Sequence, residues 1–113
     1  MIILDHQISK AELAEIATNI YGYMVKAVID VDRKIIAIDA ELHADLEKEL
    51  LLSGSLQTSL WGINLYPDAD SDDFIEFDSL INIRPRQGNM GRGVESAEIC
   101  DAISKLVSEL ILP

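Results

Sequence analysis

The sequence predicts an α+β fold in which an antiparallel sheet of four or five strands is covered on one face by an N-terminal and a C-terminal helix. Three observations lead to it. Apolar residues recur at helical spacing near both ends of the chain, two pairs of alternating segments lie between them, and a polar turn joins each pair. The expected order is a short edge strand, a helix, a hairpin, a short helix, a second hairpin and a final helix.

The first helix begins with a capping box. In Ser9-Lys10-Ala11-Glu12 the hydroxyl and the carboxylate can each accept a hydrogen bond from a free backbone N–H of the first turn. A single apolar stripe follows at helical spacing and ends near Gly22: Leu13, Ile16, Ala17 and Ile20. Residues Ile2 to Leu4, before this helix, are expected to form the edge strand.

The first hairpin is predicted from a change of period. From Tyr23 to Val31 apolar and polar residues alternate, and the alternation resumes from Ile36 to His43. A two-residue turn that pairs Val31 with Lys34 places the apolar sets on one face, with Ile29 opposite Ile36, Ala27 opposite Ile38 and Val25 opposite Ala40. A shift of one residue would turn one of these sets toward water, so this register is favoured.

The second half of the chain repeats the pattern. Residues 44 to 52 predict a short helix, and residues 60 to 66 and 74 to 84 predict two further strands. Pairing Asn64 with Glu76 keeps the apolar faces of these strands together. Ser96 is the expected N-cap of the last helix, whose apolar stripe is wide.

Composition narrows the class of protein. The chain has 113 residues, of which 49% are hydrophobic and 26% charged, which fits one globular domain over residues 1–113. The net charge of -11 disfavours nonspecific binding to nucleic acids and anionic membranes. A single cysteine, Cys100, excludes an internal disulfide, and neither an export signal nor a membrane span is found, so we expect a cytoplasmic protein.

Four segments of the chain resemble a known family. They are YGYMVKAVIDVDRK, ELHADLE, LWGINLYP and IEFDSLINIRPRQGN, which follow one another between Tyr21 and about Val94. In this order they resemble a family of short bacterial and cyanobacterial proteins classed only as a domain of unknown function. The resemblance implies intracellular, single-domain proteins and supplies no mechanism.

A metal site is one hypothesis. On the expected second strand Asp39, Glu41 and His43 share one face, and Lys26 is expected opposite Asp39. Carboxylates and imidazole suit a divalent cation, which is therefore the only cofactor considered. Neighbouring side chains on one face of a strand are about 6 to 7 Å apart, however, so three of them rarely meet at one ion. The alternative is a solvated strand face.

An anion site is a second hypothesis. The segment NIRPRQGNMGRG concentrates arginine, glycine and amide side chains in an acidic chain and leads into the last helix. Its candidate anion-binding residues are Asn82, Arg84, Arg86, Gln87, Asn89 and Arg92. The alternative is that the arginines neutralise acids of the preceding loop, such as Asp68, Asp70, Asp72 and Asp73.

A shared polar face would combine these groups. If both hairpins belong to one sheet, its polar side carries a further set of candidates: Lys26, Asn64, Tyr66, Glu76 and Asp78. The leading hypothesis is a noncatalytic binding or regulatory module that takes a small anionic ligand or a protein partner, with a homodimer as the form that closes the face. The alternative is a small metal-assisted hydrolase of phosphorylated or nucleotide-like substrates, and a weaker one is a nucleic-acid mimic.

Overall fold

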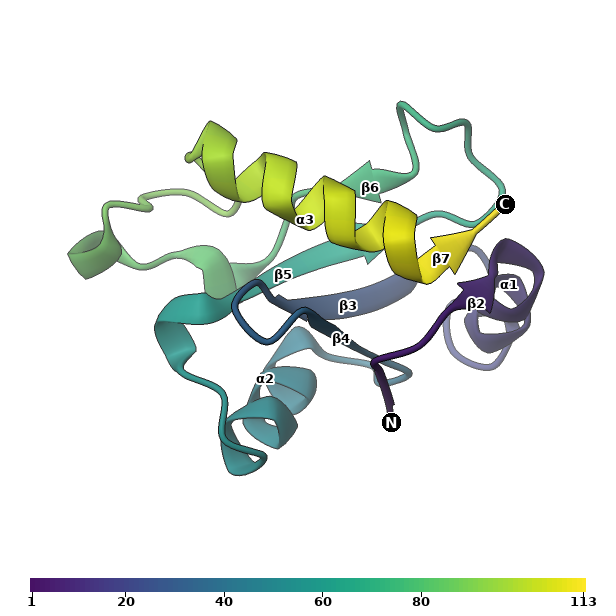
Figure 1. The fold of residues 1–113 in the computed structure, drawn as a ribbon, viewed down its shortest axis with the longest axis horizontal. Helices are drawn as coiled ribbons and strands as arrows, with labels where there is room; N and C mark the ends of the chain where they lie inside the picture. Colours follow the sequence, from purple (N-terminus) through teal and green to yellow (C-terminus); the bar gives the residue numbers. More distant parts are fainter.

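The structure, a computed structural model, describes all 113 residues and has an α+β fold, as predicted (Figure 1). The helices are α1 (Lys10–Thr18), α2 (His43–Leu52) and α3 (Ala97–Leu110), with three 3-10 helices, η1 (Gln57–Ser59), η2 (Leu80–Asn82) and η3 (Pro85–Gln87). The strands are β1 (Ile2–Leu4), β2 (Ile8–Ser9), β3 (Val25–Asp30), β4 (Ile35–Ile38), β5 (Leu60–Leu65), β6 (Ile75–Glu76) and β7 (Ile111–Leu112). None of the helices combines the length and the apolar character needed to cross a membrane.

Five strands form one antiparallel sheet in the order β1-β4-β3-β5-β6. The predicted registers are confirmed, because Ile29 lies opposite Ile36 and Asn64 lies opposite Glu76. Strand β3 also pairs with β5 along six residues, from Val25 opposite Leu65 to Asp30 opposite Leu60. The two hairpins therefore share one sheet, and residues at alternate positions of β3 and β5 lie side by side on each face.

The first hairpin turn is longer than predicted. Strand β3 ends at Asp30 and β4 begins at Ile35, so four residues connect the strands, and Lys34 takes a left-handed conformation with φ of 58°. The Asp30 carboxylate accepts hydrogen bonds from the backbone N–H groups of Asp32 (3.0 Å) and Arg33 (2.9 Å). This side chain stabilises the wider turn without changing the register of the strands.

One face of the sheet packs against α1 and α3, as predicted. The main core on this face combines Ala27, Ile29, Ile36, Trp61 and Ile63 with side chains of both helices. Ser9 and Ser96 cap the two helices, since their hydroxyls accept hydrogen bonds from the N–H groups of Glu12 (3.1 Å) and Ile99 (3.2 Å). A short parallel pair, β2 with β7, joins the start of α1 to the end of α3 and was not predicted.

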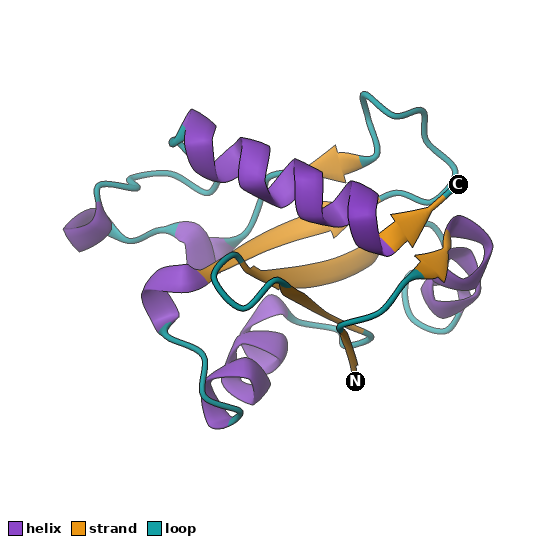
Figure 2. Cartoon of the chain, viewed as in Figure 1, coloured by secondary structure: helices purple, strands orange, loops and turns teal.

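The opposite face is covered as well, which corrects the expectation of an open polar face. A second apolar cluster on this side holds Val28, Ile35, Ala37, Leu46, Leu50 and Leu60. Leu46 and Leu50 come from α2, so the short helix packs on the side of the sheet away from α3 (Figure 2). The apolar residues at the other strand positions of β3, β4 and β5 explain why α2 covers the sheet there.

Two predicted strands are shorter than expected. Strand β4 ends at Ile38, Asp39 takes a left-handed φ of 71°, and α2 begins at His43, so residues 39 to 43 are not a strand. Strand β6 contains only Ile75 and Glu76, and η2 and η3 occupy most of the remaining segment. Alternation of side chains therefore does not place residues 39–43 or 77–84 on the polar face.

Candidate functional site

A cavity of about 500 Å³ opens between α2 and the segment that follows β6. We call it the α2 cavity. All five residues predicted for the polar face line it: Lys26, Asn64, Tyr66, Glu76 and Asp78. His43 and Arg92, which the sequence suggested for two other sites, line it too. The cavity therefore contains residues from all three sets predicted from the sequence: the polar face, the metal site and the anion site.

Strand pairing explains how the central residues meet. Lys26 of β3 lies opposite Asn64 of β5, and Asn64 lies opposite Glu76 of β6. Directly opposed residues of neighbouring antiparallel strands have Cβ atoms about 5 Å apart, so three side chains from three strands form one row across the sheet. This row forms the floor of the α2 cavity.

The Glu76 carboxylate organises one end of the row. Its Oε1 atom accepts hydrogen bonds from Asn64 Nδ2 (2.8 Å) and from the Tyr66 hydroxyl (2.7 Å). Burial and this bond to Glu76 raise the pKa of Tyr66 to about 12, so the phenol stays protonated and remains a donor at neutral pH. The carboxylate is thus fixed in position by two neutral donors.

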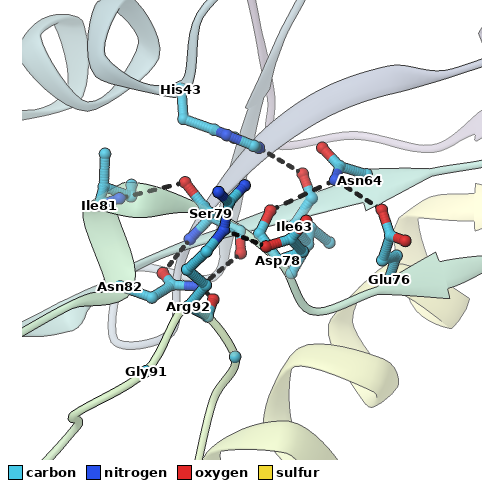
Figure 3. A network of polar contacts seen from close by, with 12 residues as sticks. His43, Ile63, Asn64, Glu76, Asp78, Ser79, Ile81, Asn82, Gly91 and Arg92 are labelled. Atoms are coloured by element: carbon cyan, nitrogen blue, oxygen red, sulfur yellow. Dashed lines mark hydrogen bonds and ion pairs between the residues drawn. The ribbon is translucent and has the colours of Figure 1, made fainter.

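Asp78 and Arg92 form an ion pair at the edge of the cavity. Arg92 Nε donates to Asp78 Oδ1 at 2.6 Å, and the backbone carbonyl of Asp78 accepts a weaker bond from Asn64 Nδ2 at 3.3 Å (Figure 3). Both side chains are partly exposed, so the pair contributes modestly to stability. The ion pair joins the chain after β6 to the loop before α3, and the bond from Asn64 Nδ2 holds the same chain against the end of β5.

Asn64 has one hydrogen-bonding atom with no partner. The residue is 6% exposed, and both bonds that it makes in the site use Nδ2. Its Oδ1 atom is buried and accepts no hydrogen bond. A buried carbonyl oxygen without a donor costs about 1 to 3 kcal/mol. Because this atom is shielded from solvent, its lost hydrogen bond is a cost to the fold and not a contact open to a ligand.

His43 forms part of the wall of the cavity. Its Nε2 atom lies 2.8 Å from the carbonyl oxygen of Ile63, and because a carbonyl can only accept, Nε2 carries the proton (Figure 3). Burial lowers the pKa of His43, and the nearby charge of Lys26 lowers it further. The imidazole is therefore neutral at pH 7, and Nδ1 is a hydrogen-bond acceptor.

The three tyrosines gather near this end of the sheet. The Lys26 ammonium lies 5.3 Å from the centre of the Tyr21 ring, and the rings of Tyr23 and Tyr66 are 6.3 Å apart. Aromatic faces attract cations, so Lys26 is held by a cation–π contact and forms no ion pair with Glu76.

The residues predicted to bind an anion do not form one site. Asn82 is fully buried, where its Oδ1 accepts from Gly62 N–H (2.8 Å) and its Nδ2 donates to Gly62 O (2.9 Å). Asn89 Nδ2 donates to the carbonyls of Asn82 and Gly93, both at 2.8 Å. These two amides hold the backbone together and are not available to a ligand.

The remaining members of that set are also dispersed. Arg84 donates to the carbonyls of Gln57 and Leu60 and lies 4.1 Å above the Trp61 ring. Gln87 Nε2 donates to Thr58 O at 2.8 Å. Arg86 is exposed beside Arg84 and Gln87 in a separate depression of about 460 Å³. The expected neutralisation of Asp68, Asp70, Asp72 and Asp73 is absent, since the only arginine ion pair joins Arg92 to Asp78.

The predicted metal ligands are not brought together. Asp39 lies outside the strand and pairs with the N-terminal amine of Met1 at 3.8 Å, while His43 is buried in α2. Lys26 lies opposite Asn64 and not opposite Asp39. No group of three His, Cys, Asp or Glu side chains in the structure could hold a metal ion. The expected placement of Asp39, Glu41 and His43 on one strand face is therefore wrong.

Sequence reasoning missed Ser79 and the role of Gly62. A Cβ atom at Gly62 would lie 2.6 Å from Ser79 Cβ, so the glycine allows the chain after β6 to lie directly on β5. Ser79 is 2% exposed and lines the cavity. A glycine inside a strand often marks a close approach of another segment, so Gly62 was the available signal.

Comparison with known proteins agrees with the resemblance seen in the sequence. A family model described as "Protein of unknown function (DUF5674)" matches residues 2–110. No curated protein and no solved structure matches the chain.

Proposed function

The chain belongs to the DUF5674 family of proteins of unknown function, and because that membership assigns no activity, we propose from the site alone that the protein is a noncatalytic module that binds a small polar ligand in the α2 cavity. The single observation that carries this proposal is a cavity of about 500 Å³ whose lining brings charged and amide side chains of three paired strands together with His43 and Arg92. Ligand pockets typically have volumes of about 300 to 1,000 Å³ and combine apolar walls with a few fixed polar groups.

The polar groups of the cavity are held in place before any ligand arrives. Glu76 is fixed by Asn64 and Tyr66, and Asp78 by Arg92. Preorganised groups lose little conformational freedom on binding, so more of the interaction energy contributes to affinity. This arrangement supports a binding role for the cavity.

The geometry supports binding over catalysis. The Ser79 hydroxyl accepts a hydrogen bond from the Ile81 N–H at 3.3 Å, and His43 directs its proton to the Ile63 carbonyl. A nucleophile needs an adjacent base, and these two side chains share no hydrogen bond. The metal-assisted hydrolase gains no support either, because Asp39, Glu41 and His43 do not converge.

A small-molecule screen with a blocked cavity tests the proposal. The screen uses amino acids, polyamines, organic acids, nucleotides and sugar phosphates, with binding followed by changes in the ¹H–¹⁵N NMR spectrum. Ala44 is exposed in the first turn of α2 and lines the cavity, so A44F fills the entrance without disturbing the core. Ala97, exposed at the start of α3 and outside every cavity, provides the matched control A97F.

We expect at least one compound to bind the wild-type protein and A97F, to bind A44F at least about tenfold more weakly, and to be recovered unchanged. A tenfold loss corresponds to about 1.4 kcal/mol. Equal binding by all three proteins, or no binding by any compound, would contradict the assignment of the cavity. Conversion of the bound compound would contradict the noncatalytic role.

A further inference from the structure

We propose that the outer edge of β6 is a docking site for an extended peptide segment in which apolar and basic residues alternate, and that this segment binds by adding a strand to the sheet. The inference goes beyond the proposed function, because it concerns a second site and a protein partner. It follows from the backbone groups at the edge of β6, from the cavities on its two sides and from the charges that line them.

The outer backbone groups of β6 have no partner in the chain. The sheet ends at β6, which pairs only with β5 (Figure 1). Tyr66 N–H donates to Phe74 O at 2.9 Å, which makes these two residues a hydrogen-bonded pair of the ladder. The next residue, Ile75, then belongs to a pair without hydrogen bonds, so its N–H and C=O point away from β5. Such an edge can accept a strand from another chain.

The open part of the edge is bounded at both ends. Ser79 N–H donates to Arg92 O at 3.0 Å, so the loop before α3 covers the edge from this residue onward. At the other end Asp73 N–H donates to Asp70 O at 2.9 Å inside the loop that leads into β6. Residues 74 to 78 remain open, and strands of about five residues are among the commonest in proteins. This stretch therefore suits a short linear segment.

The side of β6 that faces α3 is mainly apolar. A cavity of about 480 Å³ lies between the strand and the helix. Ile75 and Phe77 line it from one side, and Val107 of α3 and Ile111 of β7 line it from the other. Every second side chain of an added strand points to this side of the sheet, so apolar residues at those positions would be removed from water.

The other side of β6 is acidic. A cavity of about 390 Å³ is lined there by the carboxylates of Asp72, Asp73 and Glu76 and by no cationic residue. None of these three carboxylates forms an ion pair. The one cation at the edge, Lys10, lines the apolar cavity, where its ammonium lies 4.7 Å from the centre of the Phe74 ring. Three carboxylates and one ammonium line the two cavities together, so the charge at this edge favours a basic segment.

The same charges oppose a second copy of the chain as the occupant. Pairing of two β6 strands would bring the carboxylates of both copies together, and each copy has a net charge of -11. Like charges that face each other across an interface disfavour the complex. A basic partner meets no such repulsion.

The probe is the synthetic peptide acetyl-KIKIKIK-amide, whose binding is followed in the ¹H–¹⁵N NMR spectrum. Strand addition is measured by hydrogen exchange of the Ile75 backbone amide, because a hydrogen bond to the added strand slows this exchange. Two further peptides serve as controls. Acetyl-KKIIIKK-amide has the same residues without the alternation, and acetyl-EIEIEIE-amide reverses the charge.

The first pair of variants tests the backbone edge. I75P and I75A both remove the isoleucine side chain, but only I75P also removes the outward N–H. Proline is tolerated on an edge strand where the N–H faces solvent, so the pairing of β6 with β5 should be retained in both variants.

Two further pairs test the cavities and leave the sequence of β6 unchanged, so they decide the question even if I75P does not fold. Ser104 is exposed on α3 and lines the apolar cavity, so S104F fills this cavity, with A97F as its control. D72N/D73N removes two charges from the acidic cavity. D68N/D70N removes two exposed charges from the same loop outside both cavities.

We expect acetyl-KIKIKIK-amide to bind the wild-type protein and to slow exchange of the Ile75 amide. I75P, S104F and D72N/D73N should each bind it about tenfold more weakly than their controls I75A, A97F and D68N/D70N, a loss of the size that one hydrogen bond can account for. The two control peptides should also bind the wild type at least about tenfold more weakly. A44F should bind the alternating peptide as the wild type does, which separates this site from the α2 cavity.

Equal affinity for acetyl-KKIIIKK-amide, or equal losses in D72N/D73N and D68N/D70N, would overturn the inference, since they indicate nonspecific attraction to an acidic surface. Binding that leaves exchange of the Ile75 amide unchanged, or that is lost in A44F, would overturn it as well. Dimers of the free protein in sedimentation velocity that become monomers in I75P but not in I75A would assign the edge to a second copy of the chain and exclude the proposed partner.

Discussion

Single side chains complete the sheet where strands are missing. On the edge of β5 away from β3, β6 pairs only with Asn64 and Leu65. Further along that edge the backbone of Gly62 is satisfied by the Asn82 amide and the carbonyl of Leu60 by Arg84. A carboxamide has the same donor and acceptor as a peptide group, so Asn82 replaces one rung of a ladder. The arginine and amide residues that suggested an anion site are therefore used mainly for structure.

Replacing Asn82 tests this role. In N82L the Gly62 N–H and carbonyl lose their partners inside the protein, and the Arg92 carbonyl loses a bond of 2.9 Å. We expect the free energy of unfolding to fall by about 2 to 4 kcal/mol, measured by urea denaturation. Asn19 is exposed at the end of α1, so the control N19L should change the free energy of unfolding by less than about 0.5 kcal/mol. Similar values for the two variants would contradict the structural role of Asn82.

His43 makes stability depend on pH. Its pKa is lower in the folded protein than the ordinary value of 6.5, mainly because of burial. Between the two pKa values the unfolded chain binds more protons, so the free energy of unfolding decreases as the pH falls below about 6.5 and is constant for this group above it.

We expect H43Q to lose part of the decrease in stability between pH 7 and pH 5 that the wild-type protein shows, as measured by urea denaturation at several pH values. The other histidine, His6, is exposed and lies 3.1 Å from the Asp5 carboxylate, so H6Q serves as the comparison and should keep the decrease in stability that depends on the burial of His43. An H43Q profile parallel to that of the wild type would show that His43 does not titrate differently in the folded state.

At the scale of helices and strands, the features predicted correctly from the sequence are those that depend on residues close to one another in the chain. The serine caps of α1 and α3 and the apolar stripes of the helices depend on residues within a few positions of one another. The registers of both hairpins also followed from alternation, because a shift of one residue would expose the apolar set of a strand.

The strand predictions that were wrong concern segments whose structure is set by contacts with residues distant in the sequence. Residues 77 to 84 alternate like a strand, but Asn82 reaches 20 positions back to Gly62 and Arg84 reaches 24 back to Leu60, and these contacts hold the segment in 3-10 turns. Residues 39 to 43 leave the sheet because α2 must begin at His43 to place Leu46 and Leu50 on it. The five polar-face residues nevertheless line one cavity, since three of them lie on paired strands.

The missing side chain at Gly62 allows η2 and the residue before it to pack against β5. G62A places a methyl group 2.6 Å from Ser79 Cβ, a distance that forces the two segments apart. We expect a loss of about 1 to 3 kcal/mol in the free energy of unfolding, with NMR changes around Ser79 and Asn82. A methyl group at Gly91 meets nothing within 4 Å, so G91A is the matched control and should stay near the wild type. A neutral G62A would mean that η2 does not pack on β5 as described.

At the scale of the whole molecule, the sheet lies between α1 and α3 on one side and α2 with η2 on the other. The small size of the second cluster explains why the cavity exists. Beyond Val28 and Leu60 the strands present polar residues to this side, and α2 does not extend over them.

The excess of acidic residues predicts a response to salt. With a net charge of -11 and only one ion pair between an arginine and a carboxylate, repulsion among carboxylates opposes folding. We expect the melting temperature to rise between 10 and 300 mM NaCl, because the Debye length falls from about 30 Å to less than 10 Å over this range. The variant D70N/D72N, with two fewer charges in an exposed loop, should respond less. An unchanged or falling melting temperature would contradict this account.

The position of the single tryptophan has a practical consequence. Trp61 is 2% exposed on the strand that borders the α2 cavity, and the Arg84 guanidinium stacks on its ring. All intrinsic indole fluorescence of the chain therefore originates at one site. Its emission is expected at short wavelength in the native state and at longer wavelength once the ring meets water, so the protein carries its own optical reporter for denaturation and for displacement of the arginine.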